Sequence, residues 1–268
     1  MKKPYRLLDL FSGIGGFSLG LERSGGFKTV AFCEIDPYCR RILKKHWSYV
    51  PVYEDVQELT RHTLNADGIV VDAICAGWPC QDLSRAGKGT GLDGARSGLW
   101  REVARLVGEL RPSIVVLENV STLIDGGLGR VLGDLAALGY DAEWSCVPAS
   151  AIGAPHNRDR IWIIAYPNPN RQPISPKHDE ARRMQTHDDV ANAERGEFPF
   201  GVHLAGTWRE QQSIPWDRVW PDENSPMGMG MDDGVPQRLD RLRALGNAVV
   251  PQIPELIGRA IMEAEKAA

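Results

Sequence analysis

Short, uniformly apolar runs alternate with longer mixed segments over the first 166 residues of the chain. Runs such as Ala73–Ala76 lack the polar alternation of a half-exposed strand, and this is typical of strands buried in a parallel sheet. The segment Leu99–Leu110 instead carries its valines and leucines at helical spacing. This alternation of strand and helix predicts an open α/β sheet. The predicted strands are Arg6–Leu10, Thr29–Cys33, Ala73–Ala76, Ser113–Leu117, Trp144–Pro148 and Ile161–Tyr166.

The pattern changes after Tyr166. From residue 167 to 237, prolines, glycines and polar residues dominate, although several tryptophans argue against a disordered segment. Beyond it, Gly246-Asn247 is predicted to form a tight turn, and apolar residues from Ile253 to Ile261 share one helical face. We therefore expect a main domain over 1–166, a small irregular domain over 167–237, and a segment over 238–268 that returns to the main domain.

A glycine-rich turn follows the first predicted strand. Phe11–Gly16 (FSGIGG) stands between a strand and a helix, where glycines let a ligand approach the backbone and helix-terminal N–H groups face it. Glu34 ends the second strand roughly 20 positions later, where such folds hydrogen-bond a ribose hydroxyl. The GxGG spacing differs from the GxGxxG of dinucleotide-binding folds, so an ordinary turn is the alternative.

Two later strands end in residues that suit chemistry better than packing. Ala73–Ala76 leads into Gly77–Gln81 (GWPCQ), whose glycine and proline would hold Cys80 in a stiff frame. Ser113–Leu117 leads directly to Glu118. Because open α/β sheets collect ligands at the carboxyl ends of their strands, we expect these groups to converge with the glycine turn. A buried structural cysteine is the alternative reading of Cys80.

The composition narrows the class of protein. Among 268 residues, 43% are hydrophobic and 25% are charged, as in an ordinary globular protein. No apolar run is as long as a membrane span and the N-terminus lacks a signal-peptide core, so we expect a cytoplasmic protein without a membrane partner. Five cysteines without a CxxC pair fit a reducing compartment and predict no metal site. The net charge of −4 does not exclude nucleic acid, because a local basic patch is what binds phosphate.

Five stretches, taken in chain order, resemble the DNA (cytosine-5)-methyltransferase family, and together they cover most of the chain. They are Asp9–Gly16 (DLFSGIGG), Gly77–Gln81 (GWPCQ), Glu118–Val120 (ENV), Arg158–Arg160 (RDR) and Gly246–Pro251 (GNAVVP). The resemblance implies a Rossmann-like S-adenosylmethionine-dependent methyltransferase sheet with helices on both faces, and a target-recognition role for residues 167–237. It also implies S-adenosyl-L-methionine as cofactor, double-stranded DNA as partner and a monomeric state. It leaves open a cognate restriction endonuclease as a further partner.

The resemblance implies a role for each matched residue. Cys80 is similar to the family's nucleophile and Glu118 to the residue that grips the cytosine ring at N3 and N4. Arg160 is similar to the residue that contacts the base carbonyl, and Arg158 would support the cysteine or a phosphate. The implied cofactor residues are Phe11, Gly13, Gly15, Glu34, Asp55, Leu99 and Asn247, with Glu34 on the ribose and Asp55 on the adenine.

The chemistry of cytosine fits these roles. Carbon 5 is a poor nucleophile, so a thiolate that adds at carbon 6 would activate the ring. Glu118 at N3 would then need a raised pKa in a dry pocket. The base must leave the stacked duplex, and the glycine-rich segment Leu83–Gly98 is predicted to close over it as a lid, a passive surface loop being the alternative. Two other classes stay open: an RNA cytosine methyltransferase of the same fold, and a non-catalytic DNA-binding regulator.

Overall fold

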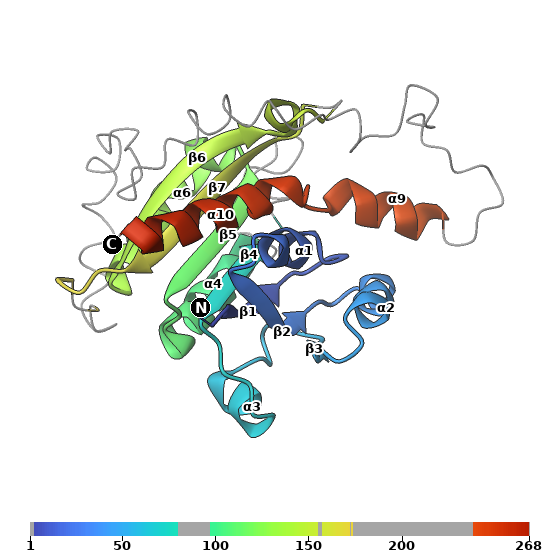
Figure 1. Cartoon of the computed structure of the whole chain (residues 1–268), viewed down its shortest axis with the longest axis horizontal. Helices are drawn as coiled ribbons and strands as arrows, with labels where there is room; N and C mark the ends of the chain where they lie inside the picture. The colour runs from blue at the N-terminus through green and yellow to red at the C-terminus, as the bar shows by residue number, and fades with distance from the viewer. Residues whose placement is uncertain (1–2, 80–96, 155–156, 172, 174–237, 268) are drawn as a thin grey trace.

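A computed structural model describes residues 3–79, 97–154, 157–171, 173 and 238–267. Within this part of the chain, helices flank one seven-stranded sheet, shown in Figure 1. The order of the strands across the sheet is β3-β2-β1-β4-β5-β7-β6. The strands are β1 (Tyr5–Leu10), β2 (Phe27–Cys33), β3 (Val52–Tyr53), β4 (Ala73–Gly77), β5 (Ile114–Val120), β6 (Tyr140–Pro148) and β7 (Asp159–Pro167).

Strand direction brings the predicted site residues to one rim of the sheet. Strands β3, β2, β1, β4 and β5 are parallel neighbours, whereas β7 runs antiparallel to both β5 and β6. The start of β7 therefore lies beside the carboxyl end of β5, where Arg160 pairs with Val120. Residues that follow β1, β2, β4 and β5 share this rim with the first residues of β7.

Helices cover both faces of the sheet, as the resemblance implied. On one face, Leu7 of β1 packs in a buried cluster with residues of α1 (Gly16–Arg23) and α10 (Gln252–Ala267). On the other, Leu8 packs in a cluster with residues of α4 (Trp100–Leu110) and α6 (Leu128–Ala137). The remaining helices are α2 (Pro37–His46), α3 (Arg61–Ala66), α5 (Leu123–Gly126), α9 (Arg238–Asn247) and the short 3-10 turns η2 (Ser97–Leu99) and η3 (Ala149–Ile152). Among the described residues, no helix is both long and apolar enough to cross a membrane.

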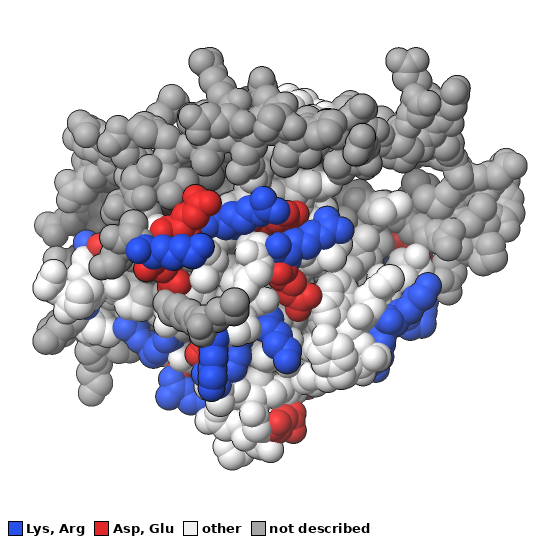
Figure 2. All heavy atoms as spheres, in the orientation of Figure 1, with Lys and Arg blue, Asp and Glu red and all other residues white. Residues whose placement is uncertain are grey.

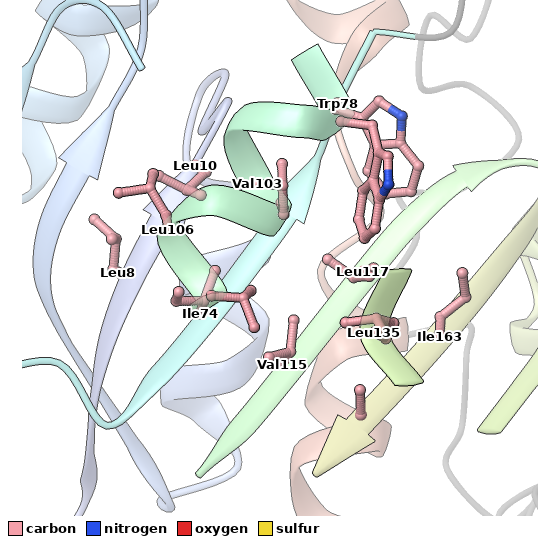
Figure 3. Close-up of a cluster of buried hydrophobic side chains, with 14 of the residues drawn as sticks. Leu8, Leu10, Ile74, Trp78, Val103, Leu106, Val115, Leu117, Leu135 and Ile163 are labelled. Carbon is pink, nitrogen blue, oxygen red and sulfur yellow. The ribbon is translucent and has the colours of Figure 1, made fainter. Parts of the chain in front are cut away.

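The cluster that contains Leu8 extends to the carboxyl rim of the sheet, where it includes Trp78. Figure 3 shows Val103 and Leu106 of α4 above side chains of the central strands, with Trp78 at the end of β4. The rings of Trp78 and Trp100 pack with their centroids 5.1 Å apart. These two tryptophans flank residues 80–96, so the packing joins the chain just before Cys80 to the start of α4.

A buried carboxyl group ties the first strand to the first helix. Asp9 of β1 is 1% exposed and accepts a hydrogen bond of 2.6 Å from the Ser18 hydroxyl of α1. Burial raises the pKa of Asp9 to about 7, against the opposing effects of the Ser18 hydroxyl and the Cys75 thiol. The glycine turn between β1 and α1 is thus anchored at both of its ends.

The C-terminal segment packs on glycines of α1. A Cβ atom added at Gly16 would lie 2.4 Å from the Val249 carbonyl oxygen, and one at Gly20 would lie 2.1 Å from that of Pro251. Figure 1 shows α10 crossing the sheet beside α1, which places these carbonyls at the entrance to α10. The contact leaves no room for a residue larger than glycine at these two positions of α1.

We expect Gly20→Ala to destabilise the protein. The added methyl group meets backbone, which cannot rotate away, so the clash should cost about 3 kcal/mol in the free energy of unfolding, more than alanine gains in helix propensity. The matched control is Gly133→Ala in α6, where an added Cβ meets nothing within 4 Å and should stabilise by up to about 1 kcal/mol. Urea denaturation measures both. A Gly20→Ala protein as stable as the wild type would contradict the packing described here.

The strands predicted from apolar runs are confirmed in their order and approximate bounds. The strand expected at Trp144–Pro148 is longer and begins at Tyr140. The tight turn predicted at Gly246-Asn247 is wrong, because these residues form the last positions of α9. Its glycine suggested a turn, but the helix extends to Asn247 and packs the buried Ala244.

Candidate active site

The glycine turn and Glu34 form one hydrogen-bonded unit. The Gly13 N–H donates to Glu34 Oε2 at 2.7 Å, and the Asp36 N–H donates to Glu34 Oε1 at 2.8 Å. Glu34 is only 8% exposed, and burial raises the pKa of its carboxyl group against the effect of these two donors. The predicted pairing of a glycine turn with an acid at the end of β2 is therefore present as a direct contact.

The backbone of the turn takes a conformation that few sequences allow. Phe11, Gly13 and Gly15 all have positive φ, at 55°, 55° and 86°, and Phe11 is one of two non-glycine residues with this geometry in the described chain. No described residue lies within 4 Å of the position that a Cβ of Gly13 would occupy, so the turn has open space beside it in the described part of the chain. Helix α1 begins after it without a side-chain cap, which leaves polar N–H groups at the same place.

Asp55 follows β3, the strand that pairs with the end of β2 just before Glu34. Strand β3 pairs with β2 through Cys33 and Tyr53, and the Glu34 N–H donates to the Tyr53 carbonyl at 2.9 Å. Burial first, and then the charges of Glu34, Asp55 and Asp9 in that order, raise the pKa of the Cys33 thiol to about 12. Glu34 and Asp55, predicted for the ribose and the adenine, thus both act on the pKa of Cys33, the last residue of β2.

An arginine of α4 holds the loop that carries Asp55. Arg105 Nη2 donates to the Val56 and Leu59 carbonyls, both at 2.9 Å, and its other nitrogens pair with Glu102 and Glu109 at 2.7 Å. The sequence pattern could have suggested the contacts within α4, whose partners are three and four residues away. It held no sign of the contacts with the loop.

The other predicted cofactor residues are less closely grouped. Phe11 and Leu99 are both partly buried and pack against the core cluster that lies under α4. Asn247 is exposed at the end of α9, two residues before Val249, whose carbonyl lies against Gly16. Sequence reasoning missed Ile35, which is 70% exposed between Glu34 and Asp36 and offers an apolar surface beside both carboxylates. An apolar residue flanked by two acids at a strand end was the available signal.

Glu118 and Arg160 meet at the ends of β5 and β7. Arg160 Nε lies 3.0 Å from Glu118 Oε1, and the Glu118 side chain is 10% exposed. Burial raises the pKa of Glu118 even though the positive charges of Arg160 and Arg158 oppose it. The structure thus brings the two residues together as predicted, in a setting that favours a protonated carboxyl group more than water does.

The strand that leads to Cys80 runs directly against Glu118. Gly77 pairs with Glu118 between β4 and β5, and a Cβ at Gly77 would lie 3.2 Å from Glu118 Oε2. The Asn119 amide donates to the Trp78 carbonyl at 3.2 Å. Cys80 itself and the greater part of the predicted lid fall outside the described residues. The described chain reaches the Glu118 carboxylate three residues before the cysteine.

Arg158 contacts the C-terminal segment. Its Nη1 donates to the Gly246 carbonyl of α9 at 2.6 Å. Burial and the nearby Arg160 lower the pKa of Arg158, while Glu118 raises it. The hydrogen bond thus joins α9 to the residue two positions before Arg160, and because its partners are 88 positions apart no local pattern could predict it.

Strands in this order, with an antiparallel β7, define an α/β protein, and its candidate site residues lie at the ends of its strands. Residues 5–212 match the family model of C-5 cytosine-specific DNA methylases. The chain therefore belongs to the C-5 cytosine-specific DNA methylase family.

The chain is also similar in sequence to proteins named type II methyltransferases. The chain is 34% identical over 185 residues to the type II methyltransferase M2.BsuMI of Bacillus subtilis, an alignment that covers 65% of this chain and 46% of that protein. It is 39% identical over 163 residues to the type II methyltransferase M.CviJI of a Paramecium bursaria Chlorella virus, which covers 60% and 43%. The chain thus spans about half the length of the curated relatives it matches. The Dnmt2 methyltransferase of S. pombe shares the fold, with a TM-score of 0.61 over 97% of this chain and 99% of that one at 16% identity.

Proposed function

We propose that the protein is a DNA (cytosine-5-)-methyltransferase that modifies a flipped-out cytosine through a covalent adduct of Cys80. The observation that carries this proposal is the pair of the buried Glu118 and the half-buried Arg160, in which Glu118 lies against Gly77 of the GWPCQ stretch. An acid with a raised pKa and a fixed guanidinium suit a ring that presents N3, an exocyclic amine and a carbonyl oxygen on one edge.

The residues around the glycine turn fit S-adenosyl-L-methionine. A carboxylate accepts about four hydrogen bonds, so Glu34 keeps acceptor capacity for ribose hydroxyls beyond the N–H groups of Gly13 and Asp36. We assign Asp55 to the adenine amine and place Ile35 against the adenine ring. Open space beside Gly13 and the uncapped start of α1 suit a polar ligand close to the backbone. Phe11, Gly15, Leu99 and Asn247 complete the proposed pocket.

The proposed reaction uses each rim residue in turn. The Cys80 thiolate adds to carbon 6 of cytosine, and Glu118 donates a proton toward N3, so that electrons collect at carbon 5. S-adenosylmethionine, when bound, supplies an electrophilic methyl group. Carbon 5 forms a bond to that methyl group as S-adenosylhomocysteine departs, and N3 returns its proton to Glu118. Loss of the proton from carbon 5 to water then breaks the bond between sulfur and carbon 6, which restores the aromatic ring and the thiolate. Arg160 holds Glu118 and the base carbonyl in place throughout.

The substrate we propose is double-stranded DNA bound at the carboxyl rim. The face that carries α10 is a poor alternative, because Figure 2 shows basic and acidic side chains intermixed there, with Arg259 paired to Glu255. We propose a catalytic and cofactor domain over 1–166, a target-recognition domain over 167–237, and a returning segment over 238–268. We also propose a monomer that acts as the modification enzyme beside a cognate restriction endonuclease.

Transfer of a labelled methyl group tests the substrate class. The protein is incubated with labelled S-adenosylmethionine and either unmethylated genomic DNA or tRNA, and the two nucleic acids are counted separately. We expect label in DNA, and bisulfite sequencing of that DNA should place it on cytosines in one sequence context. Label in tRNA alone would favour an RNA methyltransferase, and binding of DNA without transfer to either would favour a regulator.

A further inference from the structure

An arginine of α9 reaches the turn that carries Glu34. Arg243 Nη2 lies 2.9 Å from Asp36 Oδ2, a contact between residues 207 positions apart. The Asp36 side chain is 22% exposed and that of Arg243 is 69% exposed. An exposed pair of this kind adds little to global stability. Its effect is expected where it is made, at the end of β2.

Asp36 is the centre of a small network around Glu34. Its Oδ1 accepts from the Tyr38 N–H at 2.8 Å and so caps α2, while its own N–H donates to Glu34 Oε1. Arg40 of α2 donates to the Ile35 carbonyl at 2.9 Å from the other side. Oδ2 of Asp36, which does not cap the helix, is the atom that Arg243 contacts.

The same helix also contacts Arg158, through a residue one turn beyond Arg243. Gly246, three residues after Arg243, accepts the hydrogen bond of Arg158, and Arg158 in turn acts on the charge of Glu118. Helix α9 therefore contacts both the Glu34 turn and Arg158, which lies two residues before Arg160 in the sequence. It is also the first described element after the predicted target-recognition region.

We propose that Arg243 is a positioning residue for the cofactor, which through Asp36 holds the turn of Glu34, Ile35 and Asp36 in its binding conformation. The inference rests on the proposed function. A turn that is already ordered loses less conformational freedom when a ligand binds, so the ion pair acts on affinity for the nucleoside and not on the chemical step. Because α9 also contacts Arg158, it links the cofactor side of the site to the substrate side.

Four variants test this role through the binding of S-adenosylhomocysteine, measured by calorimetry without DNA. Arg243→Met removes the ion pair, whereas Arg243→Lys keeps a positive charge. Asp36→Asn keeps an oxygen to cap α2 and removes the charge that Arg243 contacts. The double variant combines Arg243→Met with Asp36→Asn. Arg259→Met, which breaks an exposed pair within α10, is the matched control.

We expect Arg243→Met and Asp36→Asn each to weaken binding about twofold to fivefold, and the double variant to bind no more weakly than either. Arg243→Lys should retain most of the affinity, and Arg259→Met all of it. In methylation of unmethylated genomic DNA, Arg243→Met should raise KM for S-adenosylmethionine and leave kcat and Tm near the wild-type values. If the wild-type protein binds S-adenosylhomocysteine, the proposed cofactor stands. Unchanged binding by Arg243→Met, or fully additive losses in the double variant, would then overturn only the inference about Arg243. A wild-type protein that binds no S-adenosylhomocysteine would instead overturn the proposed function, and this inference with it.

Discussion

Replacing Cys80 by alanine is expected to lower the rate of methyl transfer to DNA by at least about 10⁴-fold, because the group that forms the covalent bond is lost. Without a nucleophile at carbon 6, carbon 5 stays part of an aromatic ring that does not attack an electrophilic methyl group. Affinity for S-adenosylhomocysteine should not change, since the cofactor contacts that we propose lie around Glu34 and Asp55. Single-turnover transfer of labelled methyl groups to unmethylated genomic DNA measures the loss.

The cofactor affinity of this variant is also its control. A Cys80→Ala protein that binds S-adenosylhomocysteine as the wild type does is folded, so its inactivity would report on chemistry alone. Transfer at more than about one-tenth of the wild-type rate by such a protein would remove Cys80 from the mechanism.

Glu118→Gln is expected to lower kcat by about 10²-fold to 10⁴-fold, the usual contribution of a positioned acid. Glutamine keeps the shape of the side chain and an oxygen that can accept from Arg160, but it has no proton to transfer toward N3 of the base. The KM for S-adenosylmethionine should stay the same, because Glu118 lies at the end of β5 and not beside the glycine turn. Steady-state kinetics with unmethylated genomic DNA separate the two parameters.

Glu143→Gln is the matched control for this variant. Burial raises the pKa of Glu143, a residue of β6, to about 7. Its carboxylate accepts a hydrogen bond of 2.7 Å from the Tyr166 hydroxyl of β7. It shares the raised pKa of Glu118 but not the contact with Arg160. We expect wild-type kcat from Glu143→Gln. If Glu118→Gln also kept kcat within about tenfold, Glu118 would not be the acid.

Local patterns predicted most strands of the sheet and the rim that the polar residues after β2 and β4 share with Glu118. Ala73–Ala76 and most of Ser113–Leu117 are apolar because helices cover both faces of the sheet. Strands buried on both faces do not show the alternation of polar and apolar residues that a half-exposed strand shows. Since consecutive parallel strands end at one rim, the polar residues after them had to lie near one another. The contact of Glu34 with the glycine turn follows from that topology, whereas the contact of Glu118 with Arg160 also requires β7 to run antiparallel to β5.

The contacts of the C-terminal segment could not be predicted in the same way. The ion pair of Arg243 with Asp36 and the hydrogen bond of Arg158 to Gly246 join residues that are far apart in the sequence and are set by how α9 packs. Gly16 looks in the sequence like the last residue of the glycine turn, and Gly20 like an ordinary helix position, whereas backbone carbonyls of residues 249 and 251 lie against both. Such positions become visible only once the packing partner is known.

The most direct test of a covalent cysteine mechanism is to trap the adduct. DNA synthesised with 5-fluorodeoxycytidine in place of every deoxycytidine contains the target in any sequence context, and fluorine at carbon 5 cannot leave as a proton does. With S-adenosylmethionine present, we predict that the wild-type protein accumulates on this DNA as a complex that survives denaturing electrophoresis, whereas Cys80→Ala forms none. A wild-type protein that methylates ordinary DNA but leaves no such complex, or a complex that also forms with Cys80→Ala, would contradict the mechanism.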